Sequence, residues 1–231
     1  LFYYNFPLLK FCFLFTIIAV NTITNLKPSH YPEPVFQVEG SGAVVFFTFN
    51  VLWEKEHLQD ILDILDKNDI RAVFFITGEW LKRNPHEAKA MLEKGHELGN
   101  YTYSRAKLLT MPETEVEEEI KSFNVLSREL LGFQPLLFRP PYGEYNSRII
   151  RLAGEQDCIT LLWSINLFML SDLEKEYNLS RLEERLHDGA VLLFHTAYPA
   201  VAETLPDIIE FIKWKGYSIG SPEKILEKYT D

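Results

Sequence analysis

Apolar positions follow two alternating patterns from Ala43 onward. Short runs of consecutive apolar residues are separated by longer stretches in which apolar residues recur every three or four positions. The short runs are typical of strands buried on both faces, and the longer spacing is typical of amphipathic helices. The runs predict strands at 43–49, 72–76, 97–100, 136–138, 158–163 and 190–194. The spacing predicts helices at 58–65, 88–94, 116–130 and 205–212.

Strands that alternate with helices in this order predict right-handed βαβ units around a parallel sheet. The pattern alone leaves two arrangements open, an open doubly wound sheet and a closed barrel. The region from Val38 to about Tyr229 is shorter than the roughly 250 residues of a full eight-unit barrel. A barrel built from it is therefore expected to be incomplete or distorted.

The N-terminal part of the chain has a different character. The ten residues from Phe11 to Val20 include only one polar side chain, Thr16. At about 1.5 Å per residue this run covers about half of a bilayer core, which suits a secretory signal better than a transmembrane helix. Because no small-residue cleavage site follows, a cleaved signal and an uncleaved membrane anchor both remain open. We expect the signal or anchor at 1–25, a linker at 26–40 and one folded domain at 41–231.

Composition and charge narrow the class of protein. With 231 residues, of which 47% are hydrophobic, the chain has enough apolar surface for the core of one globular domain. Its formal net charge is −10, whereas a protein that tracks nucleic-acid phosphates normally presents a basic stripe. We therefore expect no nucleic-acid partner.

Polar side chains follow the ends of the predicted strands. Asn50 follows the first strand, residues 101–105 the third, Arg139 the fourth, Asn166 the fifth and His195 the sixth. The carboxyl ends of parallel barrel strands meet at one rim, where barrel enzymes build their active sites. The order of residues therefore predicts one site at this rim.

The sequences around these positions are TFNVLW (48–53), GHELGNYTYSR (95–105), LFRPPYGEYN (137–146), LLWSIN (161–166) and GAVLLFHT (189–196). In this order and spacing they resemble the polysaccharide deacetylases of carbohydrate esterase family 4, the NodB homology domain. The resemblance extends from Ala43 to Leu226 and implies an α/β fold, a deformed (β/α) barrel of seven or eight strands with a shallow groove. It also implies hydrolysis of the acetamide C–N bond of a glycan such as peptidoglycan or a chitooligosaccharide. In that reaction zinc or another divalent metal, held by one aspartate and two histidines, activates a water.

The departures from the family pattern fall on the groups that carry its chemistry. Asn50 stands at the position of the general base, and Val51 at that of the metal-binding aspartate. An amide does not take up the proton, and a valine side chain has no donor atom. Tyr101 and Arg105 replace the two metal-binding histidines, and a guanidinium stays protonated. We therefore expect no metal and no cofactor.

A further motif has lost its carboxylates, since Asn166 and Met169 stand in their places. The retained groups include His195 and Arg139, which the resemblance identifies as the acid for the leaving amine and the partner of the base. We interpret these two as remnants of catalytic machinery. The residues expected to line a glycan-binding groove are Asn50, Trp53, Tyr101, Arg105, Tyr142, Gly143 and Asn166.

The two arginines allow two interpretations. In one, Arg105 and Arg139 make the groove floor locally cationic and suited to an anionic group. In the other, Arg105 points to solvent and Arg139 pairs with a glutamate such as Glu54 or Glu144.

Loss of a general base forfeits about 10²–10⁴ in rate, and loss of the metal forfeits several kcal/mol of transition-state stabilisation. The sequence therefore favours an inactive deacetylase-like protein that binds cell-wall glycan or a partner. The alternative is an active N-deacetylase that uses His195 with non-standard ligands. TFNVLW and WSIN are similar to sporulation-associated deacetylase-like proteins. This similarity and the apolar run imply a place in the cell envelope or spore, outside the cytoplasm, with membrane attachment through the N-terminal segment as an option.

Overall fold

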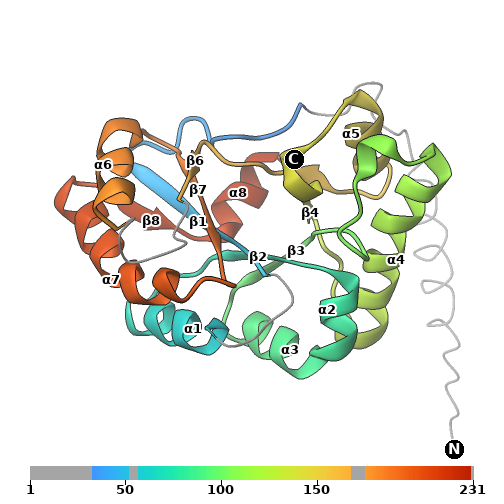
Figure 1. The fold of residues 1–231 in the computed structure, drawn as a ribbon, viewed down its shortest axis with the longest axis horizontal. Helices are drawn as coiled ribbons and strands as arrows, with labels where there is room; N and C mark the ends of the chain where they lie inside the picture. Colours follow the sequence, from blue (N-terminus) through green and yellow to red (C-terminus); the bar gives the residue numbers. More distant parts are fainter. Residues whose placement is uncertain (1–32, 52–56, 168–174, 230–231) are drawn as a thin grey trace, which may run out of the picture. The chain divides into compact units, whose positions relative to one another are not determined.

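A computed structural model of the chain describes residues 33–51, 57–167 and 175–229, which belong to one compact unit, Tyr31–Asp231. The apolar run 11–20 and the side chains of Trp53 and Met169 lie outside the described residues. A parallel sheet curls through the centre of the unit, and helices pack along its outer side (Figure 1). The predicted deformed (β/α) barrel is confirmed.

The sheet contains eight strands, in the order β5-β4-β3-β2-β1-β7-β6, with β8 paired to β1. β8 pairs with the first part of β1, at Val44 to Phe46, and β2 with the last part, at Thr48 to Asn50. The strands are β1 (Val44–Asn50), β2 (Val73–Ile76), β3 (Glu97–Asn100), β4 (Leu137–Phe138), β5 (Ile159–Thr160), β6 (Ile165–Asn166), β7 (Val191–His195) and β8 (Ser218–Gly220).

The helices α1, α3, α4 and α7 lie where the spacing of apolar residues predicts them. The α-helices are α1 (Leu58–Lys67), α2 (Gly78–Arg83), α3 (Pro85–Glu93), α4 (Glu113–Leu131), α5 (Ser147–Gly154), α6 (Lys175–Arg185), α7 (Pro199–Trp214) and α8 (Pro222–Tyr229). Short 3₁₀ turns occur at Leu108–Thr110 and Pro141–Gly143.

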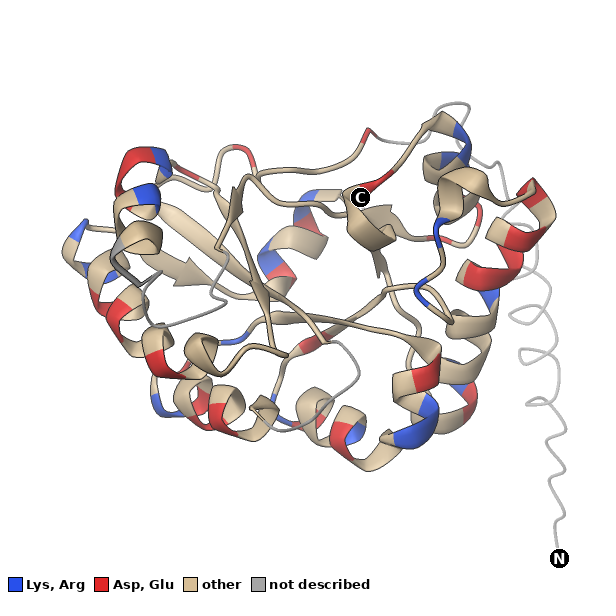
Figure 2. Cartoon of the chain, in the orientation of Figure 1, with Lys and Arg blue, Asp and Glu red and all other residues tan. Residues whose placement is uncertain are grey.

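Most charged residues lie on the outer helices, and the strands carry few (Figure 2). Within the described ranges no helix combines the length and hydrophobicity needed to cross a bilayer.

The predicted strand at 158–163 is wrong in part. Only Ile159–Thr160 form β5, which pairs with β4 at one end of the sheet. Residues 161–164, here called the crossing segment, then lead to β6, which pairs with β7 at the other end. The two ends of the sheet are therefore joined by four residues of chain. An apolar run does not reveal this crossing, because strand partners are set by hydrogen bonds between distant segments.

Side chains alternate along each strand between the helix side and the inside of the barrel. On the helix side, the rings of Phe49 and Phe74 stack with centroids 4.9 Å apart. Phe46 and Phe75 belong to the separate apolar cluster inside the barrel. Because Asn50 lies four residues after Phe46 on β1, its side chain also points inside. This alternation places the predicted polar residues at the rim of the barrel interior.

Candidate functional site

Arg139 follows β4 directly, is fully buried, and donates four hydrogen bonds to uncharged oxygens. Its Nε bonds to the carbonyl of Leu161 at 2.9 Å, and Nη2 to the carbonyl of Leu162 at 2.8 Å. Nη1 bonds to Asn50 Oδ1 at 3.1 Å, and Nη2 to Thr48 Oγ1 at 3.0 Å. The arginine therefore connects β4 and β1 to the crossing segment. We call these five residues the Arg139 network.

The surroundings of the guanidinium are largely aromatic. Its carbon lies 4.0 Å from the ring centre of Phe75 and 5.4 Å from that of Trp163. Burial lowers the pKa of Arg139 to about 9, so the group stays charged at neutral pH. Among the described residues no carboxylate pairs with it, and Glu144 is exposed. The expected pairing with Glu144 is therefore wrong, and Glu54 lies outside the described residues.

Asn50 is held on both sides of its amide. Its oxygen accepts from Arg139, and its Nδ2 donates to the hydroxyl of Tyr101 at 3.2 Å. Both Asn50 and Tyr101 are buried. A neutral amide fixed in this way has no basic atom to offer a water or a substrate.

His195 ends β7 and lies beside Asn50 in the pairing of β7 with β1. Its ring is partly buried, and burial, followed by the charges of Arg139 and Arg105, lowers the pKa of His195 to about 4. At pH 7 about one molecule in 10³ would carry the proton. The imidazole is thus neutral and is poorly suited to protonate a leaving amine.

The guanidinium of Arg105 stacks on the ring of Tyr142. This contact brings together two predicted site residues that lie on different loops. Arg105 has a left-handed backbone, φ 62°, and its N–H donates to Thr102 Oγ1 at 2.9 Å. Its guanidinium carbon lies 4.8 Å from the centre of the Tyr142 ring, and Lys107 Nζ lies 6.0 Å from it. Arg105 is partly exposed, with its guanidinium against the ring of Tyr142. The Tyr142 side chain is 48% exposed and is accessible to a ligand.

Gly143 and Asn166 complete the rim. Gly143 has φ 71°, and a Cβ there would lie 2.8 Å from Trp163, so only glycine allows this close approach of the indole. Asn166 lies on β6, and its Oδ1 is buried with no hydrogen-bond partner within the described parts of the chain. Trp53, which was also expected to line the groove, lies outside the described residues.

The donor set at the family's metal positions does not fit a divalent metal. Val51 is fully buried in the helix-side apolar cluster, whereas Tyr101 packs into the cluster inside the barrel. Arg105 contributes a cation. Across the residues that the structure describes, no three His, Cys, Asp or Glu side chains gather to hold a metal ion.

Two contributions to the site were not predicted from sequence. Thr48 and the carbonyls of the crossing segment complete the hydrogen bonding of Arg139. Thr48 lies two residues before Asn50, and that spacing on a strand places both on one face. The alternation of side chains between the two faces of a strand could therefore have identified Thr48 as a site residue. The local sequence gives no sign that the carbonyls of Leu161 and Leu162 bind Arg139, because their position depends on the path of the crossing segment.

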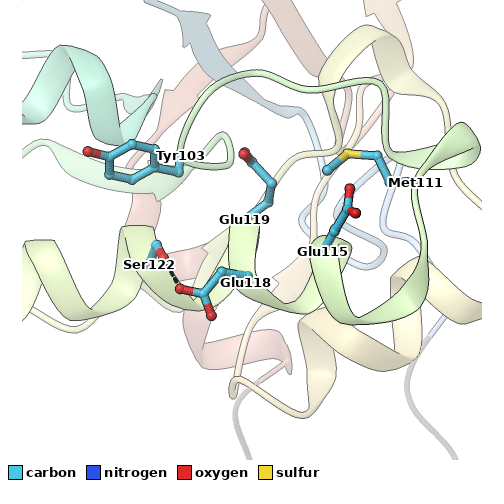
Figure 3. Close-up of a pocket in the computed structure, with 6 residues that line it drawn as sticks. All are labelled: Tyr103, Met111, Glu115, Glu118, Glu119 and Ser122. Carbon is cyan, nitrogen blue, oxygen red and sulfur yellow. Dashed lines mark hydrogen bonds between the residues drawn. The ribbon is translucent and has the colours of Figure 1, made fainter.

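The loop that carries Arg105 is fixed to α4 by Glu119. The Glu119 carboxylate accepts from Ser104 N at 2.8 Å and from Ser104 Oγ at 2.7 Å. Figure 3 shows Glu119 and Tyr103 at a shallow pocket on this side of α4. The other residues that line it are Met111, Glu115, Glu118 and Ser122. No member of the Arg139 network lines this pocket, so it is separate from the rim site.

Comparison with known proteins gives a consistent result. The profile of the polysaccharide deacetylase family matches residues 37–158, just over half of the chain. The uncharacterised protein YlxY of Bacillus subtilis is 29% identical over 210 residues, covering 89% of this chain and 66% of YlxY. The peptidoglycan-N-acetylmuramic acid deacetylase PdaA of Bacillus subtilis is 27% identical, covering 79% of this chain and 71% of PdaA. This chain thus spans about two thirds of the length of these relatives.

A solved structure shares the fold. The crystal structure of BA3943, described as a CE4 family pseudoenzyme from Bacillus anthracis, has a TM-score of 0.79 at 27% identity, covering 85% of this chain and 70% of BA3943. A BA3943 mutant is described as having restored enzymatic activity. From the match of the family profile and the shared barrel, this chain belongs to the polysaccharide deacetylase family.

Proposed function

We propose that this protein binds an N-acetylated cell-wall glycan at the rim around Tyr142 and does not hydrolyse it by the metal-dependent route of its family. The relatives named as peptidoglycan deacetylases support the class of ligand. The structural similarity to BA3943, described as a pseudoenzyme, supports a member of this fold without that activity.

The Arg139 network carries the proposal. In place of a carboxylate base, Arg139 has an amide whose oxygen and nitrogen are both engaged. A missing base forfeits about 10²–10⁴ in rate and a missing Lewis acid several kcal/mol more. The neutral His195 adds a third deficit, because the leaving amine needs a proton.

Binding of a glycan requires neither a general base nor a metal, and the rim retains groups that suit a sugar. The exposed ring of Tyr142, supported by Arg105, offers an apolar surface with a hydroxyl, which suits the C–H faces and hydroxyls of a pyranose. Peptidoglycan lies outside the cytoplasm, so this function requires export. The apolar run at 11–20 is the segment proposed to provide it, as a signal or a membrane anchor.

An acetate-release assay tests the catalytic half of the proposal. The full chain is incubated with peptidoglycan and with N-acetylglucosamine oligomers, with zinc or cobalt supplied, and PdaA serves as the positive control. We expect no acetate above the blank for either the wild type or His195→Ala. Acetate released by the wild type and abolished in His195→Ala would instead support the active N-deacetylase. Stoichiometric zinc in the purified protein would contradict the donor-set argument.

Calorimetric titration with the same oligomers tests the binding half. We expect saturable binding by the wild type and weaker binding by Tyr142→Ala, which removes the exposed ring. Absence of binding to every N-acetylated glycan tried would remove the glycan from the proposal.

A further inference from the structure

We propose that Phe36 and Tyr145 form a second saccharide subsite next to the one proposed at Tyr142. This inference rests on the proposed function, because it assigns the continuation of a glycan already held at Tyr142. Phe36 lies just outside residues 37–158, which match the family profile.

The two side chains form an exposed aromatic pair. Phe36 is 42% exposed and Tyr145 is 38% exposed, and their ring centroids lie 6.2 Å apart with planes inclined at 59°. Neither ring belongs to the apolar clusters of the core. The backbone beneath Phe36 is fixed, since Val35 forms a bridge to Leu161 of the crossing segment. The inclined pair is therefore a surface feature on a rigid support.

The pair continues the aromatic surface of the rim. Tyr145 lies three residues after Tyr142 on the loop that follows β4, and three residues of chain span at most about 10 Å. In the described part of the chain seven large hydrophobic side chains are exposed, and Phe36, Tyr142 and Tyr145 are three of them. The exposed Phe36–Tyr145 pair therefore lies a short distance along the chain from the exposed ring of Tyr142, within reach of one extended ligand.

The chemistry of the patch favours a sugar over other occupants. Its exposed neighbours Gln37, Glu144 and Asn146 are polar, so the apolar area is confined to separate rings. A stable protein–protein interface buries about 800 Å² on each partner, more than these few separate rings offer. Single rings with polar neighbours suit pyranose units, which present C–H groups on their faces and hydroxyls at their edges. The assigned ligand is the next part of the N-acetylated glycan chain.

The test compares ligands of two lengths by calorimetric titration of the full chain. The probes are the dimer and the pentamer of N-acetylglucosamine. We expect Phe36→Ala and Tyr145→Ala to lose about three- to tenfold in affinity for the pentamer and to leave the dimer unchanged. Tyr142→Ala is expected to weaken both ligands. Trp214→Ala removes a ring that is 74% exposed at the C-terminal end of α7, outside the proposed subsites, and is expected to change neither.

Further outcomes separate a subsite from simple packing. Phe36→Leu keeps an apolar side chain without the ring, and we expect it to lose pentamer affinity while it retains the thermal stability of the wild type. If Phe36→Ala and Tyr145→Ala lower thermal stability but not pentamer affinity, the pair only packs and the inference is overturned. Equal affinity of the wild type for dimer and pentamer also overturns it. If the wild type binds neither, the proposed glycan-binding function fails first.

Discussion

Asn50 and an aspartate have nearly the same shape, and the difference between them is a charge and a pair of donor hydrogens. In this protein Asn50 donates to the Tyr101 hydroxyl and accepts from Arg139. A tyrosine hydroxyl is able to donate as well as accept. A carboxylate at position 50 would therefore find two donors without movement of the backbone. The side chain at position 50 therefore keeps the shape of an aspartate but not its basic carboxylate.

Asn50→Asp is predicted to stabilise the fold at neutral pH. A hydrogen bond to a charged group contributes about 1.5–3 kcal/mol, and the cost of burying the carboxylate reduces this gain. We expect a net increase of about 1 kcal/mol in the unfolding free energy at pH 7.5. The Arg139 charge would hold the pKa of the new carboxyl below its ordinary value, so the gain is present above about pH 4 and is lost as the pH falls through the folded value.

Urea unfolding of both proteins at pH 7.5 and at pH 3 measures this effect. The matched control is the same substitution in an Arg139→Met background. There the carboxylate has lost its cation, so the substitution is expected to destabilise the protein. An equal effect in both backgrounds would show that Arg139 does not interact with position 50.

At the scale of elements, segments with a clear period or a bounded apolar run were predictable, whereas the partners of the strands within the run 158–166 were not. β1, α4 and α7 carry enough residues for a period to show. β5 and β6 have two residues each, and their identity depends on partners far away in the chain. The dependence on distant segments also limited prediction of the site. The rim positions followed from strand ends, whereas the Arg139 carbonyl partners required knowledge of the crossing segment.

Glu97 begins β3, and among the described acidic side chains its environment is the most unfavourable for the charge. Burial, and then the charge of Glu223 on α8, raises the pKa of Glu97 to about 7. Its folded pKa exceeds the unfolded value, so the folded state binds the proton more tightly. The contribution of Glu97 to stability therefore falls as the pH rises from about 4.5 to 7 and is constant above that. His96 and His195, whose pKa values are lowered to about 4, act in the opposite sense between about pH 4 and 6.5.

Glu97→Gln is predicted to gain stability relative to the wild type as the pH rises. We expect the difference in unfolding free energy to grow by about 1–2 kcal/mol between pH 5 and pH 8, a figure reduced for partial exposure of the carboxyl. Because both proteins contain His96 and His195, the effects of these histidines cancel in the difference between the two unfolding free energies. Glu223→Gln is the control, and a smaller change of the same sign is expected. A difference that stays constant with pH would refute the assignment.

At the scale of the whole molecule, the curled sheet is completed by parts that are not strands. The crossing segment joins its two ends, and the chain before β1 lies along the join. Val35 and Val38 are buried there, within the region expected to be a linker. Val35 N donates to Thr160, Leu162 N donates to Val35, and Val38 N donates to Gly189. These contacts make residues 35–38 part of the folded unit.

Truncation measures the contribution of this segment. A fragment of residues 41–231 is expected to be less stable than a fragment of residues 31–231 by about 3–6 kcal/mol. The loss arises from two buried valines, each worth about 1.5–3 kcal/mol, and from the backbone hydrogen bonds. Urea unfolding at one pH gives both values. Equal stability of the two fragments would mean that residues 31–40 do not contribute to the closure.

The four hydrogen bonds of Arg139 also affect how sequences of this family are interpreted. Because the arginine fastens two strands to the crossing segment, the fold depends on it whether or not a family member is catalytically active. An Arg-Pro-Pro-Tyr-Gly motif in a genome is then a marker of the barrel and not of turnover. A survey for working deacetylases should score the positions equivalent to Asn50, Val51, Tyr101 and Arg105 instead.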